Sequence, residues 1–205
     1  STVSGTLGIT SAGAVTDSGT LAVTGATTIS ASGQDITLDE SASTFGSLLL
    51  TGANVAVTDA GAVDLGASTV SGTLGITSAG AVTDSGTLAV TGATTISASG
   101  QDITLDESAS TFGTLALTGA NVAVTDAGAT DLGASTVGGT LGITSAGAVT
   151  DSGTLAITGA TTISASGQDI TLDESASTFG TLALTGENVA VTDAGATDLG
   201  ASTVG

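Results

Sequence analysis

Apolar and polar residues alternate over short segments of the chain, which is the pattern of β-strands with one buried face. In five segments of the first 67 residues the second and fourth positions are Leu, Ile or Val, and most of the other positions are polar or small. These segments are residues 6–10, 20–24, 35–39, 47–51 and 54–58. Side chains in a strand alternate between two faces, so Leu7 and Ile9 are predicted to point inward and Gly8 outward.

Weaker strands are expected around five further residues, which gives about ten short strands per 67 residues. These residues are Val3, Val15, Ile29, Phe45 and Val63. The apolar runs are too short for helices, and glycine recurs every few residues. The sequence therefore predicts an all-β protein.

The whole chain is a tandem repeat with a period of 67 residues. Residues 1–67 recur as residues 68–134 and 135–201, and residues 202–205 begin a fourth copy. A fixed period maintained through a chain is typical of a solenoid. We therefore expect residues 1–205 to form one continuous β-solenoid.

Two architectures fit such short strands, a row of small β-sandwiches or a single parallel β-helix. A sandwich usually needs more residues and a buried aromatic anchor, whereas each copy has a single Phe. Strands of about five residues joined by short corners favour a coil of three-sided rungs. Each rung would hold about 20–22 residues and lie about 4.8 Å from the next, so the chain would form about nine to ten rungs.

Ten strands on three sides do not divide evenly. Either one weak strand serves as a corner, or successive copies are rotated relative to one another. Three rungs of about 22 residues per copy are favoured, because identical copies would then stack with identical contacts.

The differences between copies test the assignment of inward and outward positions. Three of them fall on an outward site, on a corner, and on an inward site that gains one methylene: Leu49 to Ala116, Ala120 to Glu187, and Val90 to Ile157. Val63 is also placed inward, so Thr130 at the same position of the second copy is the least consistent difference.

The composition excludes most kinds of site chemistry. The chain has 19 Asp and Glu residues, no Lys, Arg or His, and a net charge of −19. Without cations it lacks the usual means of binding nucleic acid, and without His, Cys or Lys it cannot form a zinc site, a disulfide or a Schiff base. A hydrophobic fraction of 40% and a mean hydropathy of +0.51 argue against disorder. We therefore expect a folded protein that is not an enzyme.

The ends of the chain carry no targeting information. No apolar run approaches the roughly 18 residues of a spanning helix, so membrane insertion is not expected. The chain begins at Ser1 without a secretory signal, and it starts and stops within the repeat pattern. We expect a piece of a longer protein, whose partners are further copies of the same repeat, end to end.

Several segments carry a resemblance to a known family: TLAVTGATTIS, QDITLDESASTFG, NVAVTDAGAVDLGAS and TVSGTLGITSAGAVTDSG. They resemble the repeats of filamentous-haemagglutinin-type exoproteins, which are very large bacterial adhesins exported by two-partner secretion. The resemblance covers essentially all 205 residues but includes no catalytic motif. It implies a right-handed parallel β-helix that forms a fibrous stalk, secreted or at the bacterial cell surface. Contacts with other cells or surfaces would lie in regions outside this chain.

The expected function is a structural stalk or spacer of a giant secreted or cell-surface fibrous adhesin. The alternative is a subunit of a self-assembling extracellular filament or sheath. A binding module with a repeated ligand geometry, for calcium or for ice, is the third and least favoured hypothesis.

The densest polar cluster recurs in each copy. Its members are the candidate calcium ligands of the chain: Asp35, Asp39, Glu40, Asp102, Asp106, Glu107, Asp169, Asp173 and Glu174. Carboxylate oxygens are calcium ligands. However, Asp35 and Asp39 lie four residues apart, roughly 13 Å along a strand, and cannot chelate one ion unaided. A solvated anionic face is the simpler interpretation, and no other cofactor is expected.

Four other features have simple structural interpretations. Asp17 and Asp59 share one setting, a strand end before Gly, where a carboxylate accepts backbone N–H bonds. As the acid and base of a glycosidase the two residues would lack an aromatic platform for a sugar. Outward threonines suggest an ice-binding array, but the strand centres are too mixed for a regular lattice. Asn54 is interpreted as a turn residue and Phe45 as a core filler.

Overall fold

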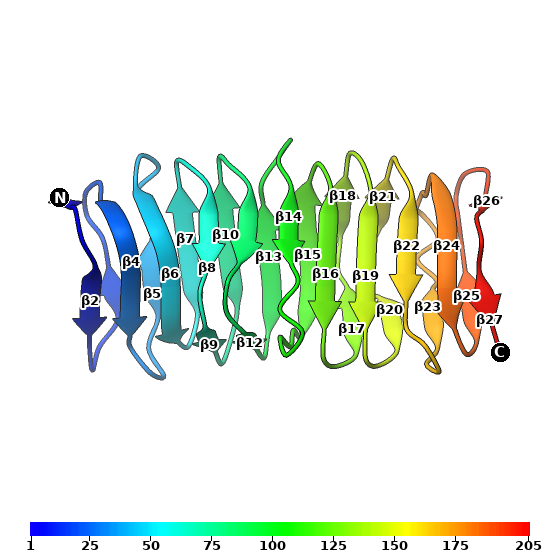
Figure 1. Ribbon diagram of the computed structural model, residues 1–205, viewed down its shortest axis with the longest axis horizontal. Coiled ribbons are helices and arrows are strands. Elements are labelled where there is room, and N and C mark those ends of the chain that lie inside the picture. Colours follow the sequence, from blue (N-terminus) through cyan, green and yellow to red (C-terminus); the bar gives the residue numbers. More distant parts are fainter.

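The computed structural model describes residues 1–205 and contains strands but no helices. The strands form two parallel sheets of 15 and 12 strands, which face each other along a rod. In Figure 1 the near strands run downward and the fainter far strands run upward as the chain advances from left to right, so the coil is right-handed. The coil has about ten turns. The predicted all-β solenoid is confirmed.

The strands of the first repeat are β1 (Thr2–Val3), β2 (Leu7–Thr10), β3 (Val15–Thr16), β4 (Ala22–Ser30), β5 (Ile36–Leu38), β6 (Thr44–Gly52), β7 (Val55–Asp59) and β8 (Val63–Leu65). The strands of the second are β9 (Ser68–Val70), β10 (Leu74–Ser78), β11 (Val82–Asp84), β12 (Leu88–Val90), β13 (Ala93–Ser97), β14 (Ile103–Leu105), β15 (Thr114–Gly119), β16 (Val122–Asp126) and β17 (Thr130–Leu132). The remaining strands are β18 (Ser135–Val137), β19 (Leu141–Ser145), β20 (Val149–Asp151), β21 (Leu155–Ile157), β22 (Thr161–Ser164), β23 (Ile170–Leu172), β24 (Thr181–Gly186), β25 (Val189–Val191), β26 (Asp198–Leu199) and β27 (Thr203–Val204).

A typical turn of the coil consists of one long strand and two short ones. In the second repeat β10 has five residues, and β11 and β12, which follow it, have three each. Strand β10 pairs with β7 and β13 in the 12-stranded sheet, whereas β11 and β12 belong to the other sheet. Three strand segments per turn agree with the predicted three-sided rung.

Successive repeats are rotated by half a turn about the axis. The ladder from β2 passes through β4, β6, β8, β11, β14 and β16 to β19, which holds the equivalent residues two repeats later. Two repeats therefore make seven turns, and one repeat makes three and a half. Strand β10, one repeat after β2, accordingly lies in the opposite sheet. The prediction of three turns per repeat is wrong, and the open alternative of rotated copies describes the fold.

The turns are also shorter than the predicted 20–22 residues. Paired residues lie between 17 positions apart, as for Leu48 and Leu65, and 22 apart, as for Ala22 and Thr44. Seven turns in two 67-residue repeats average about 19 residues. The difference arises at the corners, because some contain only two residues, such as Ala53 and Asn54 between β6 and β7.

A half-turn offset is possible because long and short strands share one alternating template. Strand β7 pairs on one edge with the short strand β5 and on the other with the long strand β10. The long strand β15 likewise pairs with two short strands, with β17 through its first half and with β18 through its second half. Identical copies therefore stack with different contacts. The prediction of three turns per repeat had assumed that the contacts would be identical.

One cluster of 41 buried apolar residues runs through the coil, and Phe45 belongs to it as predicted. The substitutions between copies fit the structure. Val90 and Ile157 are both buried, Glu187 is exposed at a corner, and Leu49 points outward between buried neighbours. One inward hydroxyl per repeat has no hydrogen-bond partner: Thr27, Thr94 and Thr161.

Position 63 is inward, as predicted, in both of the first two copies. Val63 and Thr130 are both buried. The Thr130 hydroxyl lies 3.2 Å from Oδ2 of Asp126 and 3.0 Å from Oγ of Ser145. A buried carboxylate at the preceding corner therefore explains how a polar residue fits an inward site.

Gly100 and Gly113 show two different steric reasons for glycine in the repeat. Gly100 adopts a φ of +75° in the tight turn before β14, which favours glycine. A Cβ on Gly113 would lie 2.5 Å from the carbonyl oxygen of Gly92 and would also collide with that of Thr91. At Gly113 neighbouring turns approach too closely for any side chain.

Candidate functional site

Most carboxylates lie on or beside the first short strand of each turn. One group extends from the end of the first repeat through the second, on β8, on β11 and at the two ends of β14: Asp64, Asp84, Asp102, Asp106 and Glu107. A second group extends from the end of the second repeat through the third, on β17, on β20 and at the two ends of β23 in the opposite sheet: Asp131, Asp151, Asp169, Asp173 and Glu174. We call these two groups the acidic stretches.

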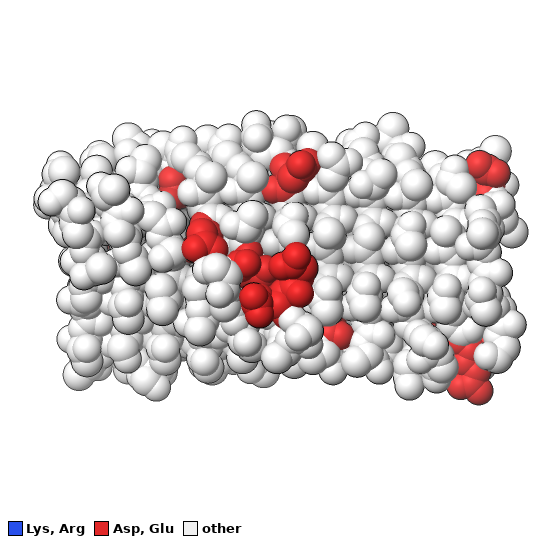
Figure 2. All heavy atoms as spheres, viewed as in Figure 1, with Lys and Arg blue, Asp and Glu red and all other residues white.

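The outward positions of the long strands carry no charge. On β16, β19 and β22 they are Ala123, Thr125, Gly142, Thr144, Thr162 and Ser164. Figure 2 shows carboxylates gathered in the middle of the near face, where β8, β11 and β14 lie, and very few on the flat face to their right. Because a repeat makes three and a half turns, neutral and acidic stretches alternate along each side of the rod, out of phase between the two sides.

The predicted calcium candidates do not form common sites. Asp102 precedes β14, whereas Asp106 and Glu107 follow it, so the strand separates the first carboxylate from the others. Oδ1 of Asp102 accepts hydrogen bonds from the next turn instead, from Nδ2 of Asn121 at 2.9 Å and its backbone N–H at 3.1 Å. The other two sets repeat this arrangement: Asp35 is apart from Asp39 and Glu40, and Asp169 from Asp173 and Glu174. No group of three acidic side chains is placed to hold a metal ion.

Asp84 lies on the preceding turn and contacts Asp106 and Glu107. This contact was not predicted from the sequence. Its Oδ1 accepts the backbone N–H of Asp106 at 2.9 Å, and its Oδ2 accepts that of Glu107 at 3.4 Å. Burial raises the pKa of Asp84, the charges of Asp106 and Glu107 raise it further, and the two backbone N–H bonds partly offset both. Asp151 repeats the arrangement one copy later. The 22-residue spacing becomes informative only once the length of a turn is known.

Asp59 and Asp126 turn the corner after a long strand, with their carboxylates buried. Oδ1 of Asp59 accepts the N–H of Gly61 at 2.7 Å, and Oδ2 accepts the N–H of Phe45 from the previous turn at 3.0 Å. Burial raises the pKa of both carboxyls, and hydrogen bonds oppose the rise. The backbone-capping role predicted for Asp59 is confirmed, and Asp126 repeats it one copy later.

Asp17 and Asp59 nevertheless differ, although the sequence places them in one setting. Oδ1 of Asp17 accepts the N–H of Asp39 on the next turn at 3.1 Å, as Asp84 does with Asp106. The two acids therefore connect neighbouring turns in opposite directions along the axis.

Asn54 connects three turns and is more than a turn residue. Its Nδ2 donates to Oδ1 of Asp35 at 2.9 Å, and its Oδ1 accepts the N–H of Thr73 at 3.1 Å. Asn121 does the same between Asp102 and Thr140. These exposed ladders fix the register of successive corners.

Hydroxyl groups form a single row along one neutral face. Residues on five successive turns are paired in this row: Thr58, Thr77, Ser97, Thr118 and Thr136. The adjacent row consists of Ala56, Gly75, Thr95 and Ala116. The face thus has one hydroxyl row beside a mixed row, which does not make the paired lattice that an ice-binding array needs.

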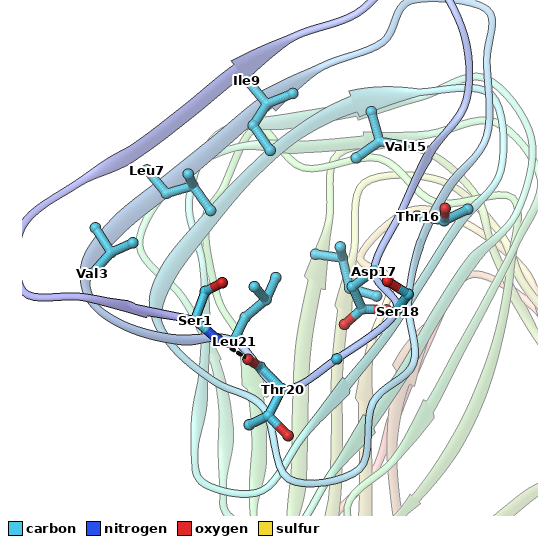
Figure 3. A pocket seen from close by; sticks show the side chains of 12 residues that line it. Ser1, Val3, Leu7, Ile9, Val15, Thr16, Asp17, Ser18, Thr20 and Leu21 are labelled. Atoms are coloured by element: carbon cyan, nitrogen blue, oxygen red, sulfur yellow. Dashed lines mark hydrogen bonds between the residues drawn. The ribbon is translucent and has the colours of Figure 1, made fainter.

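The largest cavity, about 700 Å³, opens at the amino-terminal end of the coil. Val3, Leu7, Ile9, Val15 and Leu21 point into it (Figure 3). The equivalents of these residues one repeat later are fully buried beneath the preceding turn. The cavity is therefore the uncovered interior of the first turn, and it has the chemistry of the core.

The structure has no helix that could span a membrane.

A family model described as repeats of unknown function (DUF5649) matches residues 1–51, 52–118 and 119–185. No curated protein and no solved structure shows significant similarity to the chain. The three matches cover most of the sequence, and the second and third each span one 67-residue period. The chain therefore belongs to the DUF5649 family of repeats.

Proposed function

We propose that the chain is a non-catalytic rod that serves as a stalk or spacer in a large fibrous adhesin, secreted by a bacterium or held at its surface. The observation that carries the proposal is that each repeat continues the strand ladders of the repeat before it without a break. The coil has 121 backbone hydrogen bonds, most of which join consecutive turns. Added copies therefore add length and leave the cross-section unchanged.

Other features support an extended role outside the cell. The resemblance to filamentous-haemagglutinin-type repeats points to the same class. The chain has no Cys to be oxidised during export and no Lys or Arg for trypsin-like proteases. Acidic stretches on both sides of the rod repel neighbouring rods and discourage lateral aggregation.

The proposal is tested by adding copies between a cell-surface anchor and a binding head. Three and a half turns spaced by about 4.8 Å predict about 17 Å of added length per copy. Small-angle scattering of chains with three, four and five copies should show this linear increase, whereas a flexible linker would lengthen with the square root of residue number. The binding head should be needed for adhesion. Saturable binding of cells or glycans by the purified chain alone would contradict the spacer role.

A further inference from the structure

Consecutive copies meet through the same contacts at both internal junctions. At the first junction β7 pairs with β10, with Val55 opposite Leu74. At the second β16 pairs with β19, with the equivalent Val122 opposite Leu141. The pairs β8 with β11 and β17 with β20 repeat each other in the same way. A copy can therefore be removed or inserted without creating a contact that the coil does not already contain.

The two junctions nevertheless lie on opposite sides of the rod. Strands β7 and β10 belong to the 12-stranded sheet, and β16 and β19 to the 15-stranded sheet. One outward residue of each copy follows this alternation. Thr37 on β5 and Thr171 on β23 lie in the 12-stranded sheet, whereas the equivalent Thr104 on β14 lies in the other. Each copy therefore turns the next one through about half a turn.

We propose that the number of copies sets the direction in which the rod faces as well as its length. One added copy moves everything that follows it by about 17 Å along the axis and turns it to the opposite side. A second added copy restores the original facing. The alternation rests on the strand ladders alone, and its use in presenting a binding head rests on the proposed spacer role.

The same rule applies to the surface of the rod. The acidic stretch that contains Asp64 and Asp84 lies on one side, and the stretch that contains Asp131 and Asp151 lies on the other. A partner of the rod therefore meets an equivalent surface on the same side only after two copies, or about 34 Å. After one copy it must approach from the opposite side.

The facing is measured with pairs of cysteines that carry biotin on a short linker, because the chain has no cysteine of its own. In the 205-residue chain Thr37→Cys with Thr171→Cys places both biotins on one side, so both should bind a streptavidin-coated surface. Thr37→Cys with Thr104→Cys places them on opposite sides. One biotin should then stay free and capture several-fold more fluorescent streptavidin from solution.

Deletion of residues 68–134 tests the effect of copy number. The cysteines at positions 37 and 171 then lie one copy apart, so streptavidin capture should rise to the level of the opposite-side pair. Duplication of residues 68–134 places the same cysteines three copies apart and should have the same effect. Capture that stays at the level of the same-side pair in both chains would overturn the proposal. Loss of the folded coil in both, seen by circular dichroism, would also overturn it, because the junctions would then not be interchangeable.

Spin labels at positions 37 and 171 give an independent measurement. Deletion of one copy halves their separation along the axis, from about 34 Å to about 17 Å, but adds the distance across the coil, where facing sheets lie about 10 Å apart. The measured distance should therefore stay above about 20 Å, since the labels also point away from each other. A distance half that in the 205-residue chain would show that successive copies face the same way.

These measurements fail separately from those of the spacer role. The increase in length with copy number depends only on the axial spacing of the turns. Linear lengthening without alternation would overturn the facing and leave the spacer role in place. Binding of cells by the purified chain would contradict the spacer role and leave the alternation in place.

Discussion

The hydroxyl of Thr130 lies 3.2 Å from Oδ2 of Asp126, so two polar side chains share a buried corner of the coil. In the preceding copy the same corner pairs Asp59 with Val63, and the hydroxyl is missing. A hydrogen bond to a buried carboxylate stabilises its charged form. The two corners therefore provide a natural comparison within one molecule.

Thr130→Val should lower the free energy of unfolding by about 1–2 kcal/mol at pH 7, because the buried Asp126 carboxylate loses a donor. The reciprocal Val63→Thr should raise the free energy of unfolding by a similar amount, since Asp59 and Ser78 offer the hydroxyl the same partners that Asp126 and Ser145 offer Thr130. Urea unfolding at pH 7 measures both. A Thr130→Val chain as stable as the parent would show that the bond contributes nothing.

Thr94→Val should raise the free energy of unfolding by about 1–2 kcal/mol. The Thr94 hydroxyl is buried without a hydrogen-bond partner, and valine has nearly the same shape without the polar group. Thr95→Val, on the neighbouring exposed position, is the control and should change stability little. If Thr94→Val destabilises the chain, its hydroxyl must have a partner that the structure does not show.

Gly113→Ala should destabilise the coil by about 1–3 kcal/mol through overpacking, because the methyl group meets the carbonyl oxygens of the preceding turn. Gly75→Ala provides the control. Its Cβ would lie 3.8 Å from the oxygen of Val55, an ordinary contact. Thermal unfolding of the two variants should separate them clearly, and similar melting temperatures would contradict the close approach of turns at Gly113.

The chain should become more stable as the pH falls below 7. Burial raises the pKa of Asp59, Asp84, Asp126 and Asp151 in the folded chain above their usual 3.8, so the folded state binds protons more tightly than the unfolded state. The free energy of unfolding should rise as the pH falls through the folded pKa values and level off below 3.8. Urea unfolding at several pH values measures the rise.

Asp84→Asn should reduce this gain, because it removes one of the titrating groups. Asp35→Asn removes the same charge from an exposed position and should leave more of the pH dependence in place. Equal slopes in the two variants would assign the effect to overall charge.

The inward and outward pattern could be predicted from the sequence alone. Positions such as Leu48, Leu50 and Val90 follow from strict alternation, because a strand exposes successive side chains on opposite faces. The 67-residue period also predicted that the same alternation recurs in each repeat. Alternation and repetition are properties of the sequence itself, so both can be recognised without knowledge of the fold.

The contacts between turns were decided by the tertiary structure. Whether Leu74 would lie above Leu7 or across the coil from it depended on the number of residues in each corner, and two-residue corners such as Ala53–Asn54 made the repeat three and a half turns long. The length of each turn placed Asp84 beside Asp106 and joined Asn54 to Asp35, and the half turn per repeat set the acidic stretches out of phase on the two sides. Alternation determined which side chains face inward, and the closure of the turns determined which residues became neighbours.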